Sequence, residues 1–91
     1  GRVHGGVLTS LADTAAGAAV RTMRPAGKAS ATTDLNVAFI RPPSGDTLVA
    51  IAQVIYAGKA LFRTEITVNS DNKLVARANA TFMIVSPLAN S

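Results

Sequence analysis

The residues whose types and spacing could support chemistry are the tripeptide His4-Gly5-Gly6 and, nine residues after the histidine, Asp13. Two glycines at the start of a helix leave backbone N–H groups accessible, because no side chain keeps a ligand away from them. Such donors, together with the positive end of the helix dipole, can bind an oxyanion or polarise a carbonyl. The alternative is that the glycines only allow a tight turn before the helix.

Asp13 is a carboxylate placed among Leu, Ala, Thr and Gly residues in the segment SLADTAAG. On a helix it shares a stripe with Gly6, Thr9, Gly17 and Val20, and its neighbours one turn away on that stripe are small. A substrate or a second backbone could therefore approach the carboxylate closely. The alternative is an ordinary Asp exposed on the helix surface.

Helix geometry keeps these two groups apart within one chain. Gly5 and Asp13 are eight residues apart, which is about 12 Å along a helix axis. Nucleophilic attack on a carbonyl needs about 3–3.5 Å. If both groups act on one carbonyl, they must come from two antiparallel helices related by a two-fold axis, and the site is shared between subunits.

His4 has three possible roles: an acid, a substrate contact, or a cap on the turn, and a positioning role is favoured over proton transfer. The chain holds no other histidine and no cysteine, so a metal site is not expected. Ser10 and Ser30 do not form a Ser-His-Asp arrangement with it.

The composition bounds the remaining function classes. The 91 residues form one domain, 1–91, with a formal net charge of +4. The nine Lys and Arg residues are scattered rather than clustered and only four aromatic residues accompany them, so a small polyanionic ligand is favoured over nucleic acid. No apolar run approaches the ~18 residues of a membrane span, a secretory leader is not expected, and the absence of cysteine fits a cytoplasmic protein.

The elements that position these residues follow from the periodicity. Apolar residues at three- and four-residue steps from Leu8 to Met23 predict a helix over 6–23, ended by the segment RPAGK. The period then changes to two and predicts four strands joined by short connections, which favours an antiparallel sheet. The alternation places Phe39 on the buried side of the first strand, and Tyr56 on the side of the second that faces away from Ile51. The four predicted strands are 32–41, 47–57, 60–68 and 74–85.

The segments HGGVLTSLADTAAGAA, TTDLNVAFIRP and GDTLVAIAQVIYAGK together resemble hotdog-fold acyl-CoA thioesterases of the phenylacetic-acid-degradation (PaaI-like) type. The resemblance runs in order from His4 to about Val85. It implies an α+β hotdog fold, in which a curved antiparallel sheet wraps one long central helix. It also implies a homodimer or a dimer-of-dimers tetramer with the active site at the dimer interface, in agreement with the distance argument.

The resemblance also implies roles for individual residues. The backbone N–H of Gly5, with Gly6 continuing the helix start, would polarise the thioester carbonyl. Asp13 of the opposite subunit would attack that carbonyl or activate a water, and the hydroxyl of Thr32 would help to place the water or the thioester. Coenzyme A is part of the substrate, and no separate cofactor is implied. The segments that match the coenzyme A groove contribute Phe39, Arg41, Pro42, Tyr56, Gly58, Lys59, Ala60 and Leu61, with Arg41 and Lys59 as candidate phosphate contacts.

The expected activity is therefore hydrolysis of an aromatic or short- to medium-chain acyl-CoA, without a nucleic-acid or membrane partner. The alternative is a non-catalytic acyl-CoA-binding or sensing module on the same fold. An Asp retained beside an anionic ligand favours the enzyme, because a pure binder needs no carboxylate there. Many relatives carry an Asn about six residues before the His and an earlier strand and helix. This sequence begins three residues before His4, so that segment is expected to be missing.

Overall fold

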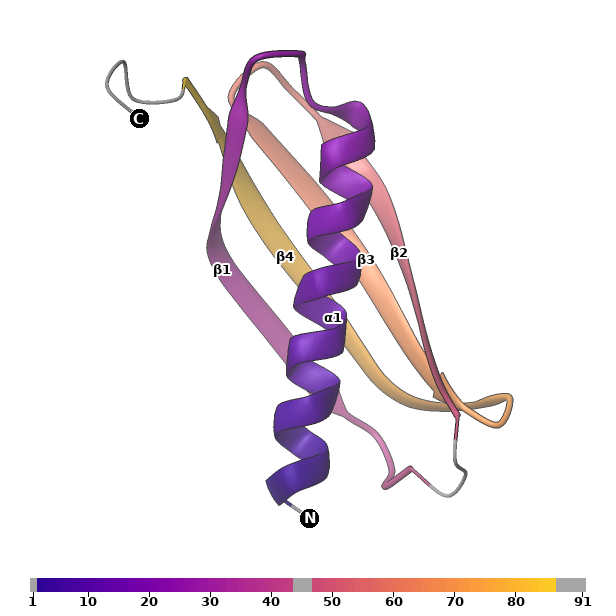
Figure 1. Ribbon diagram of the computed structural model, residues 1–91. Coiled ribbons are helices and arrows are strands. Elements are labelled where there is room, and N and C mark those ends of the chain that lie inside the picture. Colours follow the sequence, from indigo (N-terminus) through magenta and orange to yellow (C-terminus); the bar gives the residue numbers. More distant parts are fainter. Residues whose placement is uncertain (1, 44–46, 87–91) are drawn as a thin grey trace.

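The computed structural model describes residues 2–43 and 47–86, with the side chains of 2–5 left aside. Helix α1 (Arg2–Met23) is followed by strands β1 (Ala29–Phe39), β2 (Leu48–Ala57), β3 (Leu61–Ser70) and β4 (Lys73–Val85). The strands form one antiparallel sheet in the order β1-β4-β3-β2, and α1 crosses one face of it (Figure 1). The predicted arrangement of one helix on a four-stranded antiparallel sheet is confirmed.

Helix α1 begins at Arg2, four residues before the start that the periodicity indicates. The periodicity reports burial, and Leu8 is the first residue described as buried, so the periodic pattern indicates a later start than the backbone has. The residues of α1 that are almost completely buried follow one another at steps of four: Leu8, Ala12, Ala16 and Val20. Each step of four residues rotates the buried position by about 40° around the helix axis. The buried face therefore turns gradually along α1, which crosses the sheet diagonally (Figure 1).

Two placements on α1 were therefore wrong. Val20 belongs to the buried face rather than to the accessible stripe of Asp13, and Met23, expected on the buried face, is 54% exposed. The end of the helix agrees with the sequence: the N–H of Arg24 donates to the carbonyl of Val20, and Gly27 follows with a φ of +80°. A left-handed φ of this kind is one that glycine adopts without strain.

The core lies between α1 and the two central strands. Strand β3 contributes Phe62, Ile66 and Val68, and β4 contributes alanines at 76, 78 and 80 together with Phe82. Small side chains on both α1 and β4 let the helix approach the sheet closely. The β3–β4 hairpin turns at Asp71 and Asn72, which both have positive φ, as the favoured two-residue hairpin turn requires. The short connection expected between the predicted strands 60–68 and 74–85 is confirmed.

Irregularities in the edge strands change which way some side chains face. The β2–β3 register shifts between Val54 and Tyr56, so Tyr56 pairs with Arg63 on the face away from α1, together with Ile51, and its predicted side was wrong. Phe39 pairs with Ala76 on the helix side as expected. It is nevertheless 55% exposed, because the end of an edge strand receives little cover.

Replacing Ile66 by Ala is expected to lower the free energy of unfolding by about 2–5 kcal/mol, because its side chain is 1% exposed and a cavity would remain. Urea unfolding followed by circular dichroism measures this loss. The matched control is Ile51→Ala on the neighbouring strand, where the isoleucine is 57% exposed. That change should cost less than about 1 kcal/mol, the span of strand propensities. Equal losses at both positions would contradict the assignment of Ile66 to the core.

Candidate functional site

Asp13 lies on the exposed side of α1 and faces the edge strand β1. The hydroxyl of Thr32 on β1 donates to Oδ1 of Asp13 over 3.5 Å, although the two residues are 19 positions apart in the sequence. Both side chains are exposed. The structure therefore places two of the expected site residues side by side, at an edge of the sheet where a substrate or another protein chain can reach them.

The second part of the candidate site is the start of α1, which lies away from the Asp13–Thr32 contact. Because the helix begins at Arg2, Gly5 stands at the end of its first turn, directly after the residues whose backbone N–H groups lack intrahelical partners. A Cβ added at Gly6 would meet nothing within 4 Å, so this side of the helix start is open. His4 belongs to the same turn, and its side chain lies outside what the structure describes. The tripeptide therefore lies inside the helix rather than before it, and the side of α1 at Gly6 is open to a ligand.

One chain does not bring together the two segments expected to line a coenzyme A groove. Leu61 pairs with Met83 of β4, whereas Phe39 pairs with Ala76 of the same strand. These two partners are seven positions apart, which corresponds to about 23 Å along an extended strand. The segment 39–42 therefore lies near the start of α1, and the segment 56–61 lies at the opposite end of the sheet (Figure 1).

The segment 56–61 is level with Thr32 but at the other edge of the sheet. Thr32, Phe82, Phe62 and Ala57 pair successively across the four strands. Three strand spacings, about 14 Å, therefore separate Ala57 from Thr32. A groove that used both segments and the acid would have to be completed by a second copy of the chain.

The two candidate phosphate contacts are accessible. Arg41 and Lys59 are both exposed, and the N–H of Arg41 is anchored to the carbonyl of Val75. Lys59 projects from a tight turn in which the N–H of Gly58 donates to the carbonyl of Leu61 over 2.9 Å. The ring of Tyr56 lies against Gly58, where an added Cβ would come within 2.9 Å of the phenol oxygen. A residue with a side chain at 58 would displace this ring.

The sequence analysis missed a cluster around Thr81, a residue of β4 that is 6% exposed. The N–H of Thr81 donates to Oδ1 of Asp34 over 3.0 Å, and its carbonyl accepts from the hydroxyl of Thr33 over 3.2 Å. Its own hydroxyl accepts from Nη1 of Arg63 over 2.8 Å. Thr32, Thr33 and Asp34 are three successive polar residues, which fit either face of a strand. No sequence signal therefore marks the register shift that brings these groups together.

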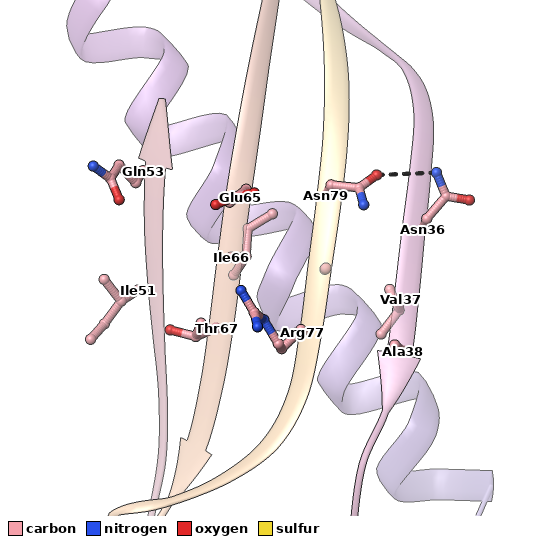
Figure 2. A pocket seen from close by; sticks show the side chains of 11 residues that line it. Asn36, Val37, Ala38, Ile51, Gln53, Glu65, Ile66, Thr67, Arg77 and Asn79 are labelled. Atoms are coloured by element: carbon pink, nitrogen blue, oxygen red, sulfur yellow. Dashed lines mark hydrogen bonds between the residues drawn. The ribbon is translucent and has the colours of Figure 1, made fainter. Parts of the chain in front are cut away.

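A hollow of about 570 Å³ lies on the face of the sheet that is turned away from α1 (Figure 2). None of the site residues expected from the sequence lines it. Its polar lining side chains include Asn36, Gln53, Glu65, Arg77 and Asn79. It is separated from the Asp13 site by the sheet itself.

The described residues, 2–43 and 47–86, offer neither a metal centre nor a membrane-spanning helix. No group of three or more His, Asp or Glu side chains among them could hold a metal ion. Within the same part of the chain, no helix is long and apolar enough to cross a membrane.

Comparison with known proteins gives consistent results. A profile described as the thioesterase superfamily matches residues 1–77. A Halobacterium salinarum protein named as an esterase is 47% identical over 70 residues, which cover 75% of this chain and 46% of that protein. The Escherichia coli protein named acyl-coenzyme A thioesterase PaaI is 47% identical over 76 residues, which cover 80% of this chain and 51% of that protein.

Solved structures agree with this result. A Bacillus halodurans protein whose crystal structure was determined with CoA is 32% identical and superimposes with a TM-score of 0.86, over 90% of this chain and 55% of that one. The chain spans about half the length of the curated relatives it matches.

Proposed function

Because the chain belongs to the thioesterase superfamily, we propose that it hydrolyses the thioester of an acyl-CoA to a free acid and CoA. Its fold is the hotdog fold that the PaaI-like resemblance implies, with one helix packed on a four-stranded antiparallel sheet. The observation that carries the proposal is the Asp13 carboxylate, exposed on α1 and in contact with the Thr32 hydroxyl at the open β1 edge. Hydrolysis needs an acceptor for a proton or an attacking oxygen at such a position.

In the proposed reaction, the backbone N–H of Gly5 polarises the thioester carbonyl as negative charge develops on its oxygen. Asp13 of a second subunit either removes a proton from a water that attacks the carbonyl carbon, or attacks that carbon itself. In both routes the C–S bond breaks and sulfur leaves as the CoA thiolate, which takes up a proton. In the second route a mixed anhydride forms first, and water then hydrolyses it.

The assignment of Gly5 and Asp13 to different subunits requires a two-fold pairing of chains. Gly5 and Asp13 lie about 12 Å apart along one helix, too far to act on one carbonyl. An antiparallel copy placed along the β1 edge would set the helix start of one subunit near Asp13 of the other. The proposed assembly is therefore a homodimer, or a pair of such dimers.

The CoA part of the substrate would lie across the same junction. Segments 39–42 and 56–61 occupy opposite ends of one sheet, so a two-fold partner can complete a groove from both. Arg41 and Lys59 are exposed and cationic, and are proposed to contact phosphates. The Bacillus halodurans relative determined with CoA supports a ligand of this class.

Hydrolysis of a panel of aromatic, short-chain and medium-chain acyl-CoAs, followed by the release of free thiol, tests the proposal. Turnover of at least one substrate is the expected result. Thermal stabilisation by CoA without turnover would instead favour an acyl-CoA-binding module. Neither turnover nor stabilisation would contradict both functions.

Replacing Thr32 by Val is expected to lower kcat by about tenfold, because one hydrogen bond to a charged group is worth roughly 1.5 kcal/mol at the low end of its range. Valine keeps the branched shape and removes only the hydroxyl that contacts Asp13. KM should stay near its original value. The control is Thr67→Val, which makes the same change on the face of β3 away from α1 and should leave kcat unchanged.

A further inference from the structure

The β1–β4 register contains one extra residue on β1 beside the candidate site. Thr32 pairs with Phe82 and Asp34 pairs with Thr81, so two steps on β1 correspond to one step on β4, and Thr33 is the inserted residue of a β-bulge. Such bulges locally disrupt the ladder and re-aim side chains.

The bulge decides which face of the sheet Thr32 occupies. Without it, the register that starts at Leu35 and Ala80 would pair Thr33 with Phe82 and Thr32 with Met83. Met83 alternates with the buried Phe82 and points away from α1, so Thr32 would point away as well. With the bulge, Thr32 shares the side of Phe82 and reaches Asp13.

Side chains of the bulge take over part of the backbone pairing. A bulge leaves backbone groups in need of partners, and unpaired ones are costly when buried. At the buried Thr81, the carboxylate of Asp34 accepts from the N–H and the hydroxyl of Thr33 donates to the carbonyl. Arg63 holds the Thr81 hydroxyl from the other side. All three contacts converge on the β4 residue that faces the inserted position.

We propose that Asp34 is a positioning residue, which fixes the bulge at Thr33 and thereby turns Thr32 toward Asp13. The carboxylate acts through β4 and needs no contact with substrate. The effect on turnover rests on the proposed function, whereas the effect on the direction of Thr32 does not.

Asn36 supplies the matched control on the same strand. It is the next residue of β1 on the face away from α1, and its amide donates to the side chain of Asn79 rather than to a backbone group (Figure 2). Truncating it removes a cross-strand contact of similar exposure and leaves the bulge untouched. A purely structural role for Asp34 would make the two truncations equivalent.

The kinetic experiment compares Asp34→Ala, Asp34→Asn and Asn36→Ala. Asp34→Ala should lower kcat by about tenfold with KM unchanged, as removal of the Thr32 hydroxyl does. Asp34→Asn should restore most of this loss, because its amide oxygen still accepts from Thr81, and Asn36→Ala should have no effect. In a Thr32→Val background, Asp34→Ala should add less than about a further twofold. Full activity of Asp34→Ala, or additive losses in the double variant, would overturn the proposal.

A second measurement is independent of catalysis. In nuclear Overhauser spectra, the Thr32 methyl group should show contacts to α1 in the unaltered chain, in Asp34→Asn and in Asn36→Ala, but lose them in Asp34→Ala. If these contacts follow this pattern while no variant hydrolyses a thioester, the positioning inference stands and the proposed function fails. If the contacts persist in Asp34→Ala, the positioning inference fails whatever the activity.

Discussion

Asp13→Asn is expected to reduce thioester turnover by about 10²–10⁴-fold, the contribution of a positioned general base. The amide keeps the shape of the carboxylate and can still accept from Thr32, but it can neither remove a proton nor attack a carbonyl efficiently. The affinity for CoA should change little, because the loss concerns the reacting centre rather than the nucleotide. Release of free thiol measures turnover, and isothermal titration with CoA measures binding.

The matched control for this change is Asp71→Asn. Asp71 is exposed in the β3–β4 turn with a φ of +50°, a conformation that Asn also tolerates. Both variants lose one negative charge, so a general electrostatic effect would appear in both. Unchanged kcat in Asp13→Asn would remove Asp13 from the mechanism, and equal losses in both variants would point to charge alone.

Mixing two inactive variants should restore activity if the site is shared between subunits. Gly5→Pro removes the proposed N–H donor near the start of α1 and is expected to lower kcat by about 10²–10³-fold. A mixed dimer of Gly5→Pro and Asp13→Asn contains one site with both groups intact. With random pairing at equal amounts, the mixture should recover about a quarter of the original activity.

The control for complementation is each variant alone, carried through the same unfolding and refolding step. A doubly substituted chain, mixed with either single variant, should also recover nothing, because no pairing then contains an intact site. Failure of the mixture to recover, with mixed dimers shown by mass spectrometry, would place Gly5 and Asp13 outside a common site.

The order and type of the elements could be predicted for two reasons. Hydrophobic periodicity reports which face of an element is buried, and turn residues mark where elements end. Strand β3, which packs on α1 with one face, begins within one residue of its predicted start. The residues that went wrong are those where regular geometry breaks. Tyr56 follows a register shift, and Val20 lies where the buried face of α1 has rotated. A local pattern assumes one constant period and therefore misses such changes.

The residue types of the candidate site could be singled out from the sequence, whereas the contacts that position them could not. The tripeptide at 4–6 and the isolated Asp13 are unusual enough to be noticed in a sequence. The contact between Asp13 and Thr32 depends on the pairing of β1 with β4 and became visible only in the structure. The bulge at Thr33 gives no signal at all, because three successive polar residues fit either register.

The two-residue turn at Asp71 and Asn72 has a consequence for the order in which the chain folds. It joins the two central strands through local contacts, whereas the bonds that hold β1 at Thr81 join residues 47 and 48 positions apart. Local pairings form fast and distant ones slowly, so we expect the β3–β4 hairpin to close first and β1 to dock late. A one-residue slip at that late step would leave the hairpin intact and send Thr32 to the wrong face. The sheet is then built before the edge that carries Thr32 is correct, and errors of folding would give ordered molecules in which Thr32 does not reach Asp13.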